Sequence, residues 1–157
     1  MPQAPLNNMP MKNKTFLIIL SAVIGISFVL NLIWENLQAP LYAGFVSLPQ
    51  HFWVCFGASI GDVSITLVFY LIVALFRKDI MWLKELRITD LVSTGIFGAV
   101  TAFFMEYFAI ASGKWAYLSA MPLLPFTTIG LTPFFQLLIL IPLTFFLTHL
   151  VFKKMNH

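Results

Sequence analysis

Long apolar runs separated by short polar stretches dominate this chain. Four runs are apolar almost throughout: residues 16–34, 52–76, 91–111 and 128–152. Each reaches the ~20 residues that an α-helix needs to cross a hydrocarbon core of ~30 Å. Open sheet edges would leave backbone groups unpaired in lipid, so helices are the structure expected there. The pattern predicts an all-α fold, an integral membrane four-helix bundle.

The composition agrees with a bilayer as solvent. Hydrophobic residues make up 60% of the 157 positions and charged residues only 10%, against about 25% charged in soluble domains. The first run is longer than the ~7–15 apolar residues of a signal peptide, so we expect it to be retained as a span. We predict one domain over residues 15–153, a disordered tail over 1–14 and a short C-terminal tail over 154–157.

The basic residues predict the orientation. Eight of the nine lie before the first run, between the second and third, or after the fourth, and only Lys114 lies in the other two loops. This asymmetry predicts that both termini lie in the cytoplasm, which in a bacterium is the inner face of the inner (plasma) membrane. The basic residues form no patch, so we expect no nucleic-acid partner. Between the second and third runs, residues 77–90 predict a short interfacial helix, with Trp82 among the headgroups and Thr89 or Asp90 as N-cap of the third span.

Two carboxyl groups lie inside the predicted spans. Asp62 is ten residues into the second run, ~15 Å deep at a rise of ~1.5 Å per residue, and Glu106 lies near the end of the third. Ionisable groups in a membrane are costly and mark functional sites. Helical spacing places each on a stripe: Cys55, Ser59, Asp62 and Thr66 in one span, and Gly95, Ala99, Ala102 and Glu106 in the other.

The first and fourth runs each carry a polar stripe as well. Ser27, Asn31, Glu35 and Gln38 share a face of the first, and Thr128, Thr132 and Gln136 a face of the fourth. Pro133 is expected to free the Ile129 carbonyl as a further acceptor. All four stripes lie in the outer half, and the two outer loops are almost uncharged and rich in Pro, as expected of loops folded over a cavity.

We therefore predict a polar pocket in the outer half of the bundle. The candidate catalytic residues are Glu106 and Asp62, as an acid and a base in unlike surroundings. The candidate ligand-binding residues are Asn31, Glu35, His51, Trp115, Tyr117 and Gln136. The alternative is that these groups satisfy one another and hold the bundle together, which is favoured for Asn31, Gln136 and the Ser and Thr residues of the stripes.

Other site chemistries find less support. The sequence has no HExxH motif and no close pair of metal ligands on one helix, so we predict neither a metal nor a cofactor. Gly61-Asp62 shares two letters with the GxGD motif of intramembrane aspartyl proteases, but Ser59 occupies the first glycine position. The single Cys55 has no base nearby in its segment and fits a small packing residue.

Several short motifs carry a resemblance. Trp34-Glu35-x-x-Gln38-x-Pro40-Leu41-Tyr42, Gly61-Asp62, Glu106-Tyr107 and Gly113-x-Trp115-x-Tyr117 resemble those of small uncharacterised bacterial four-span inner-membrane proteins. Residues 113–136 are also similar to the Trp-x-Tyr and Pro-rich segment of membrane-bound lycopene cyclases, which implies an isoprenoid-like ligand. Those cyclases continue with Pro-x-Glu-Glu, whereas Phe134, Phe135 and Gln136 follow Pro133 here.

Three functional hypotheses remain. The first is binding, with or without chemical modification, of a lipid or other apolar small molecule in the pocket. The second is a non-catalytic membrane subunit or assembly factor, whose polar stripes meet a membrane-protein partner. The third is a proton-coupled carrier acting as a homo-oligomer, because four spans are few for a carrier and no inverted repeat is visible.

Overall fold

The structure is a computed structural model that describes residues 11–155. Its helices are α1 (Met11–Gln38), α2 (Leu48–Arg77), α3 (Ile88–Ala111) and α4 (Leu131–Met155), with the 3₁₀ turns η2 (Ala39–Leu41) and η3 (Trp82–Glu85). The structure confirms the predicted all-α fold with four helices. All four α-helices are long and apolar enough to cross a membrane, which agrees with a multi-pass membrane protein. The predicted N-terminal tail lies mostly outside the described residues, but its bounds were too wide, because residues 11–14 already belong to α1. At the other end, α4 continues through Met155.

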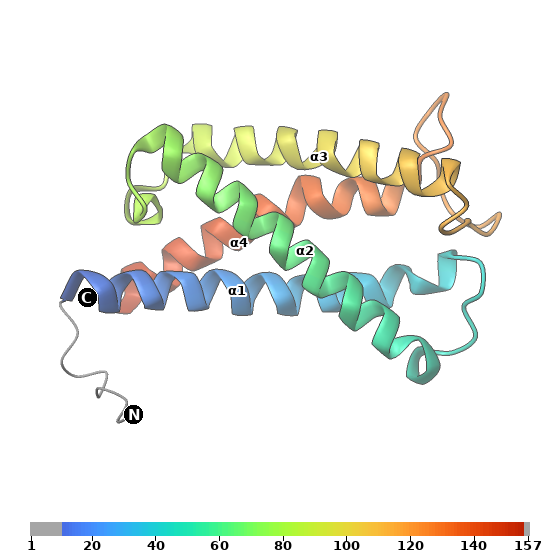
Figure 1. Cartoon of the computed structure of the whole chain (residues 1–157), viewed down its shortest axis with the longest axis horizontal. Coiled ribbons are helices and arrows are strands. Elements are labelled where there is room, and N and C mark those ends of the chain that lie inside the picture. The colour runs from blue at the N-terminus through green and yellow to red at the C-terminus, as the bar shows by residue number, and fades with distance from the viewer. Residues whose placement is uncertain (1–10, 156–157) are drawn as a thin grey trace.

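The four helices run roughly along one long axis (Figure 1). The start of α1, the end of α4 and the α2–α3 connection lie at one end of the bundle, here named the termini end. The α1–α2 connection (residues 39–47) and the α3–α4 connection (residues 112–130) lie at the opposite end, here named the loop end. The alternation of apolar helices and short connections therefore brings both polar, Pro-rich loops to the same end.

Helix packing leaves one side of the bundle open. α1 packs against both α2 and α4, and α3 packs along α4, whereas α2 and α3 make almost no direct contact. Figure 1 shows α2 crossing the bundle obliquely, near α3 at the termini end and far from it at the loop end. α2 has 30 residues, about 45 Å at the helical rise, and a span longer than the hydrocarbon thickness tilts. The tilt opens a wedge between α2 and α3.

Two glycines bring α3 close to α4. A Cβ atom at Gly98 would lie 2.5 Å from the Leu137 carbonyl oxygen, and one at Gly95 would lie 3.1 Å from the Leu138 carbonyl oxygen. Small residues allow such approach between membrane helices. The Leu138 carbonyl has no N–H donor in its own helix, because residue 142 is Pro. The packed stripe on α3 is therefore Gly95, Gly98, Ala102 and Glu106, with Gly98 in place of the predicted Ala99.

An aromatic cluster closes the termini end. Trp82 in η3 is fully buried, and its ring contacts those of Tyr70 (5.8 Å between centroids) and Phe145 (5.1 Å). The Trp82 Nε1–H donates to the Tyr70 carbonyl at 3.1 Å, and the Tyr70 hydroxyl donates to the Ile80 carbonyl. The prediction of an interfacial helix with Trp82 among headgroups was wrong: the connection folds inward as a 3₁₀ turn, and burying the indole satisfies its N–H.

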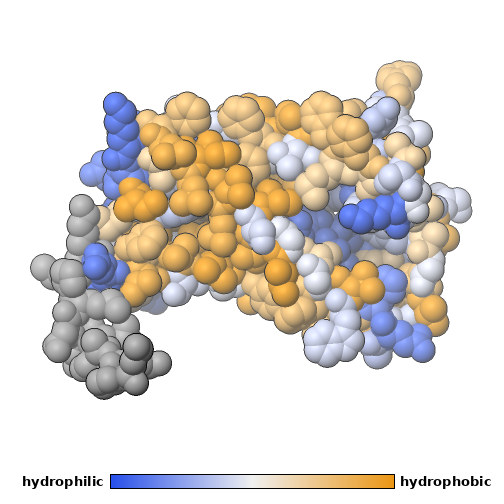
Figure 2. All heavy atoms as spheres, viewed as in Figure 1, coloured by the Kyte–Doolittle hydropathy of each residue, from blue (hydrophilic) through white to orange (hydrophobic). Residues whose placement is uncertain are grey.

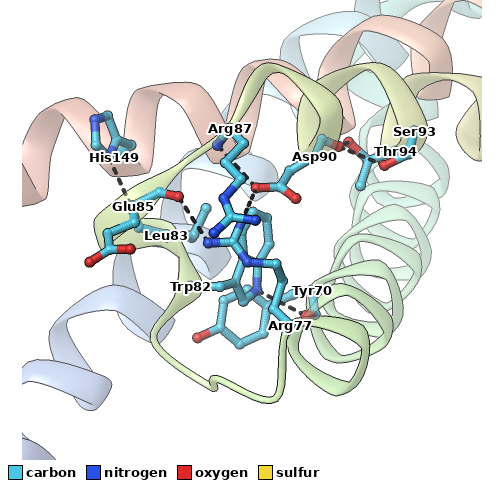
Figure 3. A network of polar contacts seen from close by, with 10 residues as sticks. All are labelled: Tyr70, Arg77, Trp82, Leu83, Glu85, Arg87, Asp90, Ser93, Thr94 and His149. Carbon is cyan, nitrogen blue, oxygen red and sulfur yellow. Dashed lines mark hydrogen bonds and ion pairs between the residues drawn. The ribbon is translucent and has the colours of Figure 1, made fainter.

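A salt bridge fixes the connection to both neighbouring helices (Figure 3). Arg77 at the end of α2 lies 2.7 Å from the Asp90 carboxylate in α3, and its other terminal nitrogen donates to the Glu85 carbonyl at 3.2 Å. The same Asp90 oxygen accepts the Arg87 backbone N–H at 3.0 Å. Arg87 is therefore the N-cap residue and Asp90 the third helical residue, which corrects the predicted N-cap at Thr89 or Asp90.

The two loops at the loop end pair with each other. Ala43 N–H donates to the Ala116 carbonyl, and Leu118 N–H donates to the Leu41 carbonyl, both at 2.9 Å. These bonds flank an antiparallel bridge between Tyr42 and Tyr117, whose rings pack edge to face at 5.3 Å. Backbone pairing thus joins the α1–α2 and α3–α4 connections and holds them over the same end of the bundle.

Candidate functional site

A cavity of about 470 Å³ opens in the loop-end half of the bundle. Figure 2 shows the molecule from the side of α2 and α3, and this face is hollowed toward the loop end, with hydrophilic atoms deep in the hollow and apolar atoms around it. The walls include Val54, Ala58 and Ile65 from α2 and Ala102 and Met105 from α3. The polar lining residues are Glu35, Gln38, Tyr42, His51, Cys55, Asp62, Glu106, Lys114, Trp115 and Gln136.

Gln136 is the centre of the polar network inside the bundle. Its Nε2 lies 2.9 Å from Glu35 Oε1, 2.9 Å from Asp62 Oδ2 and 3.1 Å from Asn31 Oδ1. Its Oε1 accepts from Gln38 Nε2 at 2.8 Å, and the same Gln38 nitrogen lies 3.0 Å from Glu35 Oε1. Residues of α1, α2 and α4 therefore meet at one amide, which has two N–H groups for three acceptors.

Asn31 continues this network away from the cavity. Its Nδ2 donates to the Ser27 carbonyl at 2.9 Å, and the Ser27 hydroxyl donates to Thr66 Oγ1 at 3.1 Å. Asn31 is almost fully buried and does not line the cavity. For Asn31, Ser27 and Thr66 the structure matches the alternative weighed from sequence, in which buried polar groups satisfy one another.

Glu106 on α3 is held by the α3–α4 loop. Trp115 Nε1 donates to Glu106 Oε2 at 3.1 Å, and the Tyr117 hydroxyl donates to the same oxygen while accepting the Gly130 N–H at 3.1 Å. Burial, and next the adjacent Glu106, raises the pKa of the Tyr117 hydroxyl above its ordinary range. The phenol therefore keeps its proton at neutral pH and remains a donor to the carboxyl group.

Two basic side chains lie among the lining residues contributed by the loop end. His51, in the first turn of α2, packs against Phe45 with 5.5 Å between ring centroids. Lys114 Nζ lies 5.7 Å from the centre of the Trp115 ring, and Lys114 takes part in no salt bridge within the described part of the chain. The cavity therefore combines three carboxyl groups in its interior with a lysine and a histidine from the loop end.

Most of the predicted site residues come together. Glu35, His51, Asp62, Glu106, Trp115 and Gln136 line the cavity, so the carboxyl groups of the second and third spans share one interior. Tyr117 and Asn31 lie behind this lining and contact Glu106 and Gln136. Gln38, Tyr42 and Lys114 also line it and were not chosen from sequence, although Gln38 stands three residues after Glu35 on the same helical face.

Asp62 is ten residues into the predicted run, and because α2 begins earlier, at Leu48, it lies about 21 Å along the helix at ~1.5 Å per residue. One detail of the predicted site was wrong, the role of Pro133. Pro133 lies in the first turn of α4, where no intrahelical N–H is needed. The Ile129 carbonyl precedes that helix and accepts the Leu124 N–H at 2.9 Å, so it is not the free acceptor expected.

Comparisons of the chain with protein-family models, curated proteins and solved structures return no match. The resemblances drawn from the motifs therefore stay predictions. Within residues 11–155, the structure contains no group of three or more His, Cys, Asp or Glu side chains arranged to hold a metal ion.

Proposed function

We propose that this chain binds a lipid or another apolar molecule with a polar group in the cavity at the loop end. The observation that carries the proposal is an apolar-walled cavity of about 470 Å³ that holds three carboxyl groups and opens between α2 and α3. Small-molecule sites occupy ~300–1,000 Å³ and combine apolar walls with a few placed polar groups. A ligand dissolved in the bilayer reaches such a site sideways, without crossing water.

The proposal includes the orientation inferred from the basic residues. The termini end, with Arg77, Lys84, Arg87 and Lys153, faces the cytoplasm, and the loop end faces the opposite side of a bacterial inner membrane. The cavity then lies at the depth of the outer leaflet. The termini end is packed with the buried aromatic cluster of Trp82, Tyr70 and Phe145, which favours a binding site over a carrier.

The test is native mass spectrometry of the full-length protein purified in mild detergent. We expect a co-purified lipid or apolar molecule on the wild type and its loss in Ala58→Phe, because residue 58 lines the cavity and its side chain is exposed there. Ile60→Phe places the same aromatic side chain at an exposed position on α2 outside the cavity lining and should retain the ligand. A wild-type protein without a bound molecule, or equal retention by both variants, would contradict the proposal.

A further inference from the structure

Most of the hydrogen-bond donors deep in the cavity are already in use. The Gln38 amide donates to Glu35 and Gln136, and the Gln136 amide is shared by three acceptors. The Trp115 indole and the Tyr117 hydroxyl both donate to Glu106. These groups have no further N–H or O–H to offer a ligand.

The acceptors are not used up. The bonds to the carboxyl groups all reach Glu35 Oε1, Asp62 Oδ2 and Glu106 Oε2. The second oxygen of each carboxyl group has no hydrogen bond within residues 11–155. Independently, Gln38, which lines the cavity and is 4% exposed, has a buried Oε1 without a partner in the described residues. Unmatched acceptors in an apolar surrounding are costly. The Tyr42 hydroxyl also lines the cavity and donates no hydrogen bond in the described residues, but these free acceptors outnumber it. The interior of the cavity therefore has more free acceptors than free donors.

The mouth has the opposite character. Lys114 is a cation with no salt-bridge partner in the described residues, and His51 lines the same cavity. Lysine binds phosphate as a point charge. A ligand that fits both regions carries N–H donors and positive charge at one end and an anionic group next to them.

Resting on the proposed function, we propose that the ligand is a phospholipid with a primary ammonium headgroup, as in phosphatidylethanolamine. The ammonium supplies three N–H donors to the free oxygens of Glu35, Asp62 and Glu106, and the phosphate lies near Lys114. The acyl chains leave through the opening between α2 and α3, past Val54, Ala58 and Met105. In phosphatidylcholine the ammonium is fully methylated, so it keeps the positive charge but has no N–H donor. A comparison of the two lipids therefore tests the hydrogen bonds separately from the charge.

The experiment measures headgroup preference directly. The full-length protein in mild detergent is mixed with equal amounts of dioleoyl phosphatidylethanolamine, its N,N-dimethyl derivative, phosphatidylcholine and phosphatidylglycerol, and bound lipid is quantified by native mass spectrometry. We expect phosphatidylethanolamine to bind about tenfold or more over phosphatidylcholine, since two or three charge-assisted hydrogen bonds are lost. The dimethyl lipid, with one N–H, should be intermediate.

Two carboxyl-to-amide variants locate the preference. Asp62→Asn and Glu106→Gln should bring the ratio of the two lipids close to one, whereas Glu85→Gln, an exposed residue at the termini end, should keep the wild-type ratio. Each variant is first checked for a monodisperse elution profile, and the wild-type lipid series remains decisive if a variant does not fold. Equal binding of phosphatidylethanolamine and phosphatidylcholine, or preference for phosphatidylglycerol, would overturn the headgroup assignment while a lipid in the cavity still stands. Binding of none of the four lipids, together with no co-purified molecule, would overturn the proposed function itself.

Discussion

At the scale of single residues, the amide of Gln136 joins three helices. One NH₂ group serves Asn31 Oδ1, Glu35 Oε1 and Asp62 Oδ2, so two protons are shared among three acceptors. An amide flip would face the Gln136 oxygen toward those acceptors, so the network itself fixes the orientation of the side chain. The position therefore contributes both to the stability of the bundle and to the placement of the cavity carboxyl groups.

Replacing Gln136 by Met tests this role. Met keeps the side-chain length but leaves several buried acceptors without a donor, and each unsatisfied group costs about 1–3 kcal/mol. We expect Gln136→Met to lower the free energy of unfolding by about 3 kcal/mol or more, measured by thermal or denaturant unfolding in detergent. Gln50→Met removes an exposed amide that accepts only from the Ser47 hydroxyl and should leave stability nearly unchanged. Similar stability of both variants would show that the network is not structural.

At the scale of the elements, the contact between α3 and α4 depends on the absence of side chains. At Gly98 a Cβ would meet the Leu137 carbonyl carbon at 3.0 Å as well as its oxygen at 2.5 Å, and these are backbone atoms that cannot rotate away. α3 also carries Glu106 two turns further on. Any separation of α3 from α4 therefore moves one of the three cavity carboxyl groups.

We expect Gly98→Ala to destabilise the protein by about 1–3 kcal/mol, as overpacking does in protein cores. The measurement is the midpoint of thermal unfolding in detergent, combined with lipid retention at the cavity. Gly57→Ala makes the same exchange at an exposed helical position with open space around it, and gains about 0.5–1 kcal/mol from helix propensity. If Gly98→Ala is as stable as Gly57→Ala, the close contact between the two helices is not required.

Helical periodicity made it possible to predict from sequence that Asp62 and Glu106 point into the bundle. Each lies on a stripe of polar or small residues, and such stripes face other helices. The connection around Trp82 could not be predicted, since an indole near a helix end fits either the headgroup layer or a buried turn. Packing against Tyr70 and Phe145, far away in sequence, decides between them. The tilt of α2 could not be predicted either, because the length of an apolar run allows a range of tilt angles and does not determine one.

At the scale of the whole molecule, the two ends of the bundle differ in character. The termini end is closed by the aromatic cluster and the Arg77–Asp90 salt bridge, and the loop end holds the cavity beneath two loops joined by backbone hydrogen bonds. A site that opens sideways at one end and is sealed at the other is suited to molecules from a single leaflet. Which leaflet depends on the orientation, so the topology is the prediction with the widest consequence.

Labelling of single cysteines determines that topology. In a Cys55→Ala background, Ser119→Cys places a thiol at an exposed position of the loop end, and Lys84→Cys places one at an exposed position of the termini end. Because eight of nine basic residues lie on the side of the termini, we expect a membrane-impermeant maleimide to label Ser119→Cys in bacterial cells whose outer membrane has been permeabilised. Lys84→Cys should react only after the inner membrane is disrupted. The reverse pattern would place the cavity in the cytoplasmic leaflet, where the same headgroup chemistry would select lipids from the other side.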